Sequence, residues 1–418
     1  MRVVVHDYSG HPFQVQLSRE LARRGHEVLH LHFAGFQTPK AALVRRADDP
    51  PTFAVEAIDL DRPFAKYRLL QRLLQERQLG GILAKRIRGF DPDVVISSNA
   101  PLDIQVGAYH ASRAAGAAFI FWLQDVYSDA ITRHLRRKLP GLGQLVALRF
   151  VALERSLLQK ADGVVAITDD FRPRLQQWNL KPDRVVTIEN WAPLDDIAPR
   201  PKDNPWAREH GLHDRPVILY SGTLGLKHNP ALLLELAKRL QAEEPEARLV
   251  VVSEGLGADW LSERGRGLET LVQLPFQPFD RLADVIGTAD IVVAILEPDA
   301  GVFSVPSKVL SYLAAGRPII GALPVENLAA RLITKNGAGI VVSPLDPDAL
   351  AVACIDLLPR DDDRREMGRS ARAYAESAFD IGQIADRFEA VMLAARPDPD
   401  KLKSSRPADR THRKDVAA

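Results

Sequence analysis

A glycine-rich segment with a lysine is the first feature of the sequence that could bind a phosphate. Ser221-Gly222-Thr223-Leu224-Gly225-Leu226-Lys227-His228 directly follows a short apolar run. Backbone amides around its glycines could wrap a diphosphate, and the ammonium of Lys227 would neutralise the charge. The spacing differs from that of a Walker loop, which ends in Gly-Lys-Ser/Thr. The alternative interpretation is a solvated lysine in a surface loop.

A second such segment runs from Val305 to Pro318. Pro306 and Ser307 are helix-start signals, and Gly316 ends the predicted helix. The Ser307 hydroxyl, the Lys308 ammonium and free backbone amides would then meet at the positive end of the helix, where a phosphate binds well. Helix capping alone would explain Ser307. It would not explain a lysine placed against the helix dipole, so the pattern favours binding.

The turn His6-Asp7-Tyr8-Ser9-Gly10-His11 is the third candidate. Gly10 allows a tight turn, and the helix that follows favours an anion near His11. The segment does not have the G-x-G-x-x-G spacing of a dinucleotide site. A strand-to-helix turn that simply requires a glycine is the alternative.

Short apolar runs before and between these segments predict strands that are buried on both faces. In the first half they are Val3–Val5, Val28–His32, Val94–Ser97, Phe119–Trp122, Val164–Ile167 and Val185–Ile188. In the second half they are Val217–Ser221, Ala247–Ser253, Leu271–Leu274, Ile291–Ile295, Pro318–Gly321 and Gly339–Val342. Helical patterns such as Phe13–Arg24 and Leu145–Lys160 lie between the runs. This alternation predicts two α/β domains with parallel sheets, which bind ligands at the carboxyl ends of their strands.

Composition limits the classes of protein further. The chain has 418 residues, 46% of them hydrophobic, and 55 Lys+Arg against 54 Asp+Glu. A wholly disordered chain and a protein that coats nucleic acid are both excluded. The single cysteine, Cys354, indicates a reducing compartment. The longest stretch without charge, Val28–Pro39, is too short to span a membrane, and we expect no cleavable signal peptide before the strand at Val3.

The order of several motifs resembles the retaining glycosyltransferases of family 4, in particular their bacterial exopolysaccharide and O-antigen branch. The segments that carry the resemblance are Leu21–Val28, Ala161–Thr168, Val185–Asn190, Tyr220–Lys227 and Pro306–Pro318. The resemblance implies a GT-B fold, in which two Rossmann-like α/β domains face each other across a cleft, with a C-terminal crossover helix. It also implies a nucleotide-sugar donor, a polyprenyl-linked or oligosaccharide acceptor, no cofactor and no metal.

Domain boundaries follow from this resemblance and from composition. We expect an acceptor-binding domain over residues 1–192, a linker over 193–212 where prolines accumulate, and a nucleotide-sugar-binding domain over 213–378. A helix over 379–396 would return to the first domain. The tail 397–418, which is rich in Pro, Asp, Lys and Arg, is predicted to be disordered.

On the donor side, the resemblance assigns Gly222 and Lys227 to the diphosphate site. Thr223 stands where the family usually has an arginine. The two glutamates of the family's E-x7-E pattern are replaced by Phe303 and Ser311, so sugar recognition must differ, and Ser307 and Lys308 would take part of the phosphate role. The remaining residues that we place in the donor site are Glu254 and Phe276.

On the acceptor side, Gln124-Asp125 follows the predicted strand Phe119–Trp122 at the position of the family's His-Asp or Arg-Asp. We therefore expect Asp125 to be catalytic together with Lys227, and Gly10, His11 and Gln124 to line the acceptor site. A helix cap is the alternative role for Asp125. The resemblance further implies a front-face reaction, in which the leaving phosphate accepts the proton of the acceptor.

A basic segment favours a peripheral position on the inner face of the cytoplasmic membrane. Between Asp61 and Phe90, eight Lys and Arg face two acidic residues and alternate with leucines at helical spacing. A second basic cluster lies between Arg133 and Lys138. Basic amphipathic helices bind anionic lipids, although a solvated helix face would show the same pattern.

Two other functions remain open for the same fold. A nucleotide-sugar 2-epimerase would need acidic residues and a histidine for proton abstraction or elimination, and the sequence offers no assignable set. A catalytically silent nucleotide-sugar-binding subunit is the other alternative, because the glutamate pair is missing. The donor base, the sugar, the acceptor and the oligomeric state are not encoded in these motifs.

Overall fold

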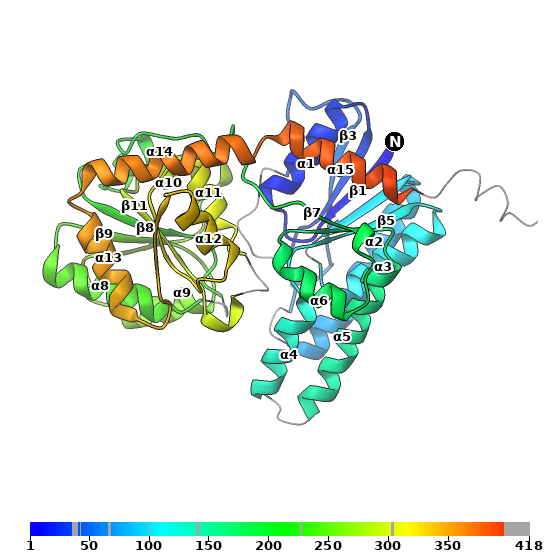
Figure 1. The fold of residues 1–418 in the computed structure, drawn as a ribbon, viewed down its shortest axis with the longest axis horizontal. Coiled ribbons are helices and arrows are strands. Elements are labelled where there is room, and N and C mark those ends of the chain that lie inside the picture. The colour runs from blue at the N-terminus through cyan, green and yellow to red at the C-terminus, as the bar shows by residue number, and fades with distance from the viewer. Residues whose placement is uncertain are drawn as a thin grey trace, which may run out of the picture.

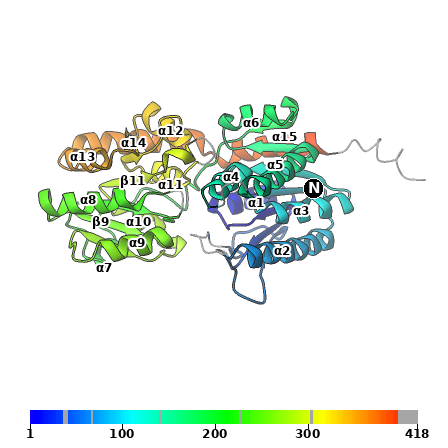
Figure 2. The ribbon, with the colours of Figure 1, turned by 90° about the horizontal axis from the view of Figure 1, so that it is seen from below.

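Two parallel sheets, each flanked by helices, form two domains that lie side by side (Figure 1). The structure is a computed structural model that describes residues 1–35, 41, 43–65, 68–98, 100–138, 142–225, 228–301 and 305–396. Viewed at right angles, the helices lie on both faces of the sheets (Figure 2). The architecture is that of the GT-B fold.

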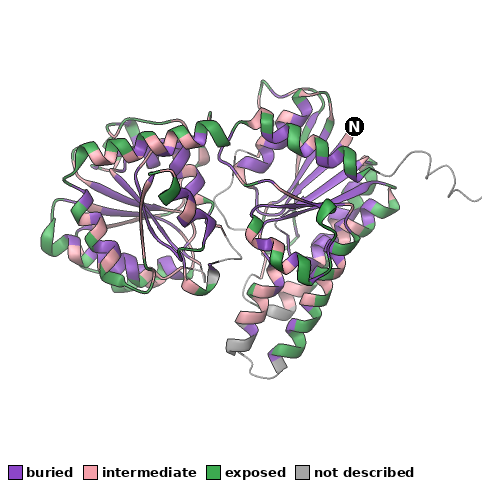
Figure 3. Cartoon of the chain, in the orientation of Figure 1, coloured by how far each residue is buried: buried purple, intermediate pink, exposed green. Residues whose placement is uncertain are grey.

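The first sheet contains seven strands within the described ranges, in the order β3-β2-β1-β4-β5-β6-β7. They are β1 (Arg2–Asp7), β2 (Glu27–Phe33), β3 (Phe53–Ile58), β4 (Val94–Ser98), β5 (Ala118–Leu123), β6 (Gly163–Ala166) and β7 (Val185–Thr187). β4, β5 and β6 are buried along their whole length, which explains their continuous apolar runs (Figure 3). The sequence patterns missed β3, because this edge strand includes the partly exposed Glu56 and has no such run.

The helices of the first domain connect these strands. They are α1 (Pro12–Arg23), α2 (Leu69–Phe90), α3 (Leu102–Ala114), α4 (Tyr127–Lys138), α5 (Leu142–Lys160) and α6 (Arg172–Gln177). α4 and α5 pack against each other as a hairpin that projects from the body of the domain (Figure 1).

Among the described residues between Asp61 and Phe90 there is one helix, α2, and those before Leu69 are not helical.

The second sheet has six parallel strands among the described residues, in the order β10-β9-β8-β11-β12-β13. They are β8 (Val217–Ser221), β9 (Arg248–Val252), β10 (Leu271–Leu274), β11 (Ile291–Ile295), β12 (Ile319–Ala322) and β13 (Gly339–Val342). Its main helices are α8 (Pro230–Glu243), α9 (Leu256–Arg264), α10 (Leu282–Gly287), α11 (Lys308–Ala314), α12 (Leu328–Lys335) and α13 (Pro347–Leu357). All six strands coincide with predicted runs to within two residues.

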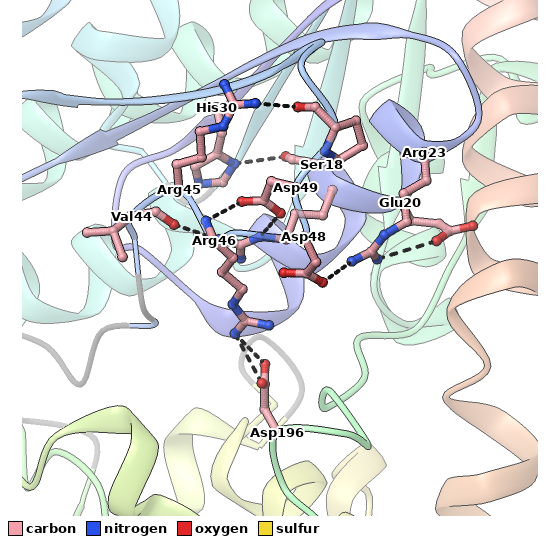
Figure 4. Close-up of polar contacts among 12 residues, drawn as sticks. Ser18, Glu20, Arg23, His30, Val44, Arg45, Arg46, Asp48, Asp49 and Asp196 are labelled. Atoms are coloured by element: carbon pink, nitrogen blue, oxygen red, sulfur yellow. Dashed lines mark hydrogen bonds and ion pairs between the residues drawn. The ribbon is translucent and has the colours of Figure 1, made fainter.

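The connection between the sheets has no helix or strand from residue 188 to residue 204, where it makes a turn at residues 194–197, and the short helix α7 (Pro205–Glu209) follows before β8. Asp196 in this connection accepts two hydrogen bonds from Arg46, at 3.0 and 3.1 Å (Figure 4). The Arg46 amide in turn donates to Asp49 (2.7 Å), a buried carboxylate that pairs with the buried Arg19 at 2.8 Å. The loop before β3 is thus tied both to α1 and to the connection between the domains.

The C-terminal helices α14 (Asp361–Ala378) and α15 (Ile381–Ala395) run from the second domain back to the first (Figure 1). Asp380 begins α15, since its carboxylate accepts a hydrogen bond from the Gln383 amide at 2.8 Å. α15 packs against α1, β5 and β6, and the ring of Phe388 lies 4.7 Å from that of Trp122. The chain therefore has the crossover helix of the fold. The tail 397–418 lies outside the described residues.

Candidate functional site

Gly222 directly follows β8, at the carboxyl edge of the second sheet. Its φ of +134° is one that residues with a side chain rarely adopt. A Cβ atom at this position would lie 3.0 Å from Cε of Lys308, so the glycine also makes room for the lysine. These two residues, which sequence patterns placed in separate segments, are in contact.

Lys308 is the first residue of α11, and its side chain folds against the end of β8. Its Nζ donates a hydrogen bond to the Tyr220 hydroxyl and lies 3.7 Å from the centre of the Tyr220 ring. The Tyr220 hydroxyl donates onward to the Thr223 carbonyl at 2.9 Å. Burial lowers the pKa of the Lys308 ammonium well below its ordinary value, because the charged form loses its hydration there. An anion close to this amine would restore the charged form.

Ser307 occupies the residue before α11, but it does not have the capping role that its type suggested. Its hydroxyl makes no capping hydrogen bond and the residue is exposed. α11 is instead held to β8 by Tyr312, whose hydroxyl accepts from the Ser221 amide (2.9 Å) and donates to the Ser221 carbonyl (3.2 Å). Ser311, at the position of a family glutamate, lies in the same helix and is partly buried.

Glu254 and Phe276 follow β9 and β10 at the same edge of the sheet. The Glu254 carboxylate accepts a hydrogen bond from the Phe276 amide at 3.3 Å. The loop after β8 joins them, because the Leu224 amide donates to the hydroxyl of Ser253 at 3.1 Å. The structure therefore brings Gly222, Thr223, Lys308, Glu254 and Phe276 to the carboxyl ends of three adjacent strands. Lys227 and Phe303 lie outside the described residues.

On the first domain, Gly10 and His11 form the turn between β1 and α1. Gly10 has a φ of +78°, a backbone conformation that glycine adopts more readily than residues with a side chain. The buried carboxylate of Asp7 accepts hydrogen bonds from the amides of Ser9 (3.0 Å) and His11. Burial raises the pKa of Asp7 above its ordinary value. Nearby His11 and these amides act in the opposite direction but do not outweigh burial. Sequence patterns did not single out Asp7, although it ends a buried strand and precedes a glycine turn, which is a recognisable signal.

Gln124 and Asp125 lie in the loop between β5 and α4. The amide group of Gln124 pairs with that of Asn190, with one hydrogen bond in each direction at 2.6 and 3.3 Å. Asp125 is partly buried. The amides that a capping Asp125 would bind are those of Tyr127 and Ser128, and both donate to Glu154 at 2.9 Å. The helix-cap alternative for Asp125 is therefore disfavoured.

An aromatic cluster packs next to the loop that carries Gln124 and Asp125. Trp122, two residues before Gln124, stacks on Trp191 with 5.9 Å between the ring centres. The Trp191 indole N–H donates to the Gln16 side chain at 2.7 Å. With Phe388 of α15 against both indoles, the end of β5 is fixed by side chains from three distant parts of the chain.

The basic segment around α2 is more paired than its sequence suggested. Arg72 forms an ion pair with the buried Glu76 at 2.6 Å. Leu79 and Leu83 are buried in the core of the domain, so they do not offer an apolar face to a membrane. Among the described helices, none is long and apolar enough to cross a bilayer. The described ranges also contain no group of three or more His, Cys, Asp or Glu that could hold a metal ion.

Comparison with known proteins identifies both domains. Residues 11–191 match the family model of the glycosyl transferase 4-like domain, and residues 215–360 match that of the glycosyl transferases group 1. The putative colanic acid biosynthesis glycosyl transferase WcaI of Escherichia coli K12 is 26% identical over 309 residues, which cover 72% of this chain and 74% of WcaI.

Two further proteins extend the comparison. D-inositol 3-phosphate glycosyltransferase of Geodermatophilus obscurus is 29% identical over 58% of this chain, and the match spans 54% of that protein. The crystal structure of Anabaena HepE, in complex with UDP and glucose, superposes with a TM-score of 0.69 at 16% identity and covers 94% of this chain and 100% of HepE. The two matched domains and the shared fold show that this chain belongs to the GT-B glycosyltransferases with a family 4-like N-terminal domain.

Proposed function

We propose that the protein transfers a sugar, with retention of configuration, from a nucleotide-sugar to a lipid-linked or polysaccharide acceptor in cell-surface polysaccharide biosynthesis. The observation that carries the proposal is the partly buried Lys308 amine against Gly222, at the sheet edge where α/β domains bind ligands. The name of WcaI, a colanic acid biosynthesis glycosyl transferase, and the UDP and glucose bound to HepE support it.

The role of the donor site in this proposal is to stabilise the leaving nucleotide diphosphate. Negative charge accumulates on the diphosphate as the glycosidic bond breaks, and a cation already in place lowers the energy of that state. Lys308 supplies one cation from α11, and we assign Lys227 as a second. Glu254 and Phe276 would border the nucleotide, since their loops lie at the same edge. In this scheme the reaction proceeds without a metal ion.

The role of the first domain is to present the acceptor. We assign Asp125 to orient the acceptor hydroxyl, with Gly10, His11 and Gln124 around it. In a front-face reaction the hydroxyl attacks from the side of the leaving group, and a diphosphate oxygen takes its proton. The absence of glutamates at Phe303 and Ser311 means that the sugar hydroxyls are recognised by other groups than in members with the E-x7-E pattern.

Incubation with UDP-, GDP- and dTDP-sugars tests this function. We expect one donor to bind and to be hydrolysed slowly, or transferred when membrane lipid extract is present. We expect Asp125→Asn to lower turnover by at least about 100-fold and to leave donor binding unchanged. Conversion of the donor to its C2 epimer would instead establish an epimerase. Binding without turnover in any extract would establish a silent binding subunit.

We also propose that the enzyme docks on an anionic membrane through the α4–α5 hairpin. Residues 130–153 contain five Lys or Arg and no Asp or Glu. On α5, Leu145 and Leu148 are 67% and 62% exposed, and Val146 between them is also exposed. Basic charge beside exposed apolar side chains is the pattern of interfacial helices. α2 contributes less, because Arg72 is paired and Leu79 is buried.

Vesicle co-sedimentation tests the docking surface. We expect binding to vesicles that contain phosphatidylglycerol, weak binding to pure phosphatidylcholine, and partial release by salt, since each nearby cation contributes about 1 kcal/mol. Arg136→Gln with Arg137→Gln should lower binding, and Leu145→Gln with Leu148→Gln should remove the salt-resistant fraction. The control is the exposed Arg369→Gln on α14. Equal binding of all variants would exclude the hairpin as the docking surface.

A further inference from the structure

Glu154 is a buried carboxylate to which the proposed reaction gives no role. It lies in α5 and is fully buried. One carboxylate oxygen accepts a hydrogen bond from the Tyr127 amide and the other from the Ser128 amide, each at 2.9 Å. These are the first two amides of α4. Both carboxylate oxygens of Glu154 thus bind the first turn of the neighbouring helix α4.

The first amides of a helix are normally satisfied by the residue just before it, most often Ser, Thr, Asp or Asn. Here that residue is Val126, which is buried and whose side chain has no group that could accept a hydrogen bond. Glu154 replaces the missing cap from another helix, and its negative charge lies at the positive end of the α4 dipole. The arrangement ties the two helices of the hairpin together at their base.

The capped amides follow the candidate catalytic residue almost directly. Only Gln124, Asp125 and Val126 lie between the end of β5 and the start of α4. β5 is fixed by its register with β6, where Leu123 pairs with Ala166. A loop of three residues with a fixed strand on one side has little freedom once the helix on its other side is also fixed.

We propose that Glu154 is a positioning residue, whose ionised carboxylate caps α4 and thereby holds Asp125 in the geometry that glycosyl transfer requires. The assignment of Asp125 rests on the proposed function, whereas the cap itself does not. Protonation of Glu154 would turn one acceptor oxygen into a donor that faces another donor, so one amide of α4 would lose its partner and the loop would loosen.

Burial places the ionisation of Glu154 near neutral pH. Burial is the largest influence and raises the pKa of Glu154 to about 7, with a smaller upward contribution from Asp129 of α4. The hydroxyl and amide of Ser128 and the amide of Tyr127 act in the opposite direction. Asp129 is itself paired with Arg174 of α6. Because the pKa of Glu154 is raised in the folded protein, the free energy of unfolding falls as the pH rises from the ordinary value of 4.5 to about 7, and this loss is the cost of the ionised cap.

Glu154→Gln and Glu154→Leu test the proposal, with the exposed neighbour Arg155→Gln as the matched control. We expect Glu154→Gln to lower kcat by about 10- to 100-fold, because displacement of a reacting group by about 1 Å can cost about 100-fold. KM for the donor should stay within about two-fold, since the second domain is untouched. Wild-type kcat should lose half of its maximum near pH 7 on the acid side, and this limb should disappear in both Glu154 variants.

Hydrogen exchange provides a readout that does not require activity. In the wild type, protection of the amides of Tyr127 and Ser128 should rise as the pH increases through about 7, and Glu154→Gln should abolish this change. A folded Glu154→Gln protein with wild-type kcat and an unchanged acid limb would overturn the proposal. So would pH-independent protection of these amides in the wild type, which remains measurable if the variants do not fold. If the wild-type protein transferred no sugar from any donor, the proposed function would be refuted, but the exchange result on the α4 cap would remain valid.

Discussion

Replacement of Lys308 by methionine separates the role of the amine in binding from any role in the fold. Methionine keeps the apolar stem against Tyr220 and removes the charge together with the hydrogen bond to the Tyr220 hydroxyl. Loss of a charge-assisted contact to phosphate costs about 1.5–3 kcal/mol. UDP, or whichever nucleoside diphosphate the wild type binds, should therefore bind about 10- to 150-fold more weakly to Lys308→Met.

The lowered pKa of Lys308 makes a second part of this prediction. A bound diphosphate favours the ammonium form, so binding should take up a proton, and affinity should rise as the pH falls from 10.5 toward the folded pKa. In the protein without a ligand, the lowered pKa of Lys308 reduces the free energy of unfolding. The unfolded chain binds more protons, so Lys308 weakens the fold at neutral pH, and the methionine variant should melt at the same or a higher temperature.

Calorimetry in Hepes and in Tris measures both the affinity for the nucleoside diphosphate and the number of protons taken up on binding. The binding enthalpy of the wild type should differ between the buffers in proportion to the proton taken up, and that difference should vanish in Lys308→Met. Tyr220→Phe is the matched control, because it removes the hydroxyl that accepts from Lys308 but keeps the amine. Unchanged affinity of Lys308→Met together with no proton uptake by the wild type would refute the diphosphate site.

Three further predictions concern the remaining contacts. Asp125→Asn should reduce kcat by at least about 100-fold and leave the dissociation constant of the donor unchanged, as measured by calorimetry. Phe388→Ala should lower the free energy of unfolding by about 3–5 kcal/mol in urea titrations, since its buried ring packs against both Trp122 and Trp191. Asp49→Asn should cost about 3–5 kcal/mol, because it leaves the buried Arg19 guanidinium without its counter-charge.

Each of these has a defined control. Asp125→Glu should retain part of the activity, and full activity in Asp125→Asn would exclude a catalytic role. Leu393→Ala, on the exposed side of α15, should leave the unfolding curve in place, and an equal loss in both α15 variants would contradict the packing argument. Exposed Asp48→Asn should cost less than about 1 kcal/mol, and a similar cost for Asp49→Asn would contradict the burial of its ion pair.

Much of the fold follows from local pattern. Parallel strands that are covered on both faces require continuous apolar runs, and the runs at Val94 and Ile291 reappear as β4 and β11. Strand β3 escaped prediction because an edge strand does not need such a run. The loops with candidate residues were also predictable, since Gly222 and Gln124 follow strands directly in the sequence.

The sequence by itself determined every described strand except β3, the order of the two domains and the loops that carry their polar residues, because these depend on the spacing of neighbouring side chains. Only the tertiary structure decided which side chains meet. Lys308 finds its acceptor in Tyr220, which is 88 residues away, and α4 takes its cap from Glu154, 27 residues from Tyr127. Leu79 and Leu83 of α2 turn inward for the same reason: contacts between segments distant in sequence are set by how the helices pack on the sheet, and no local pattern records that packing.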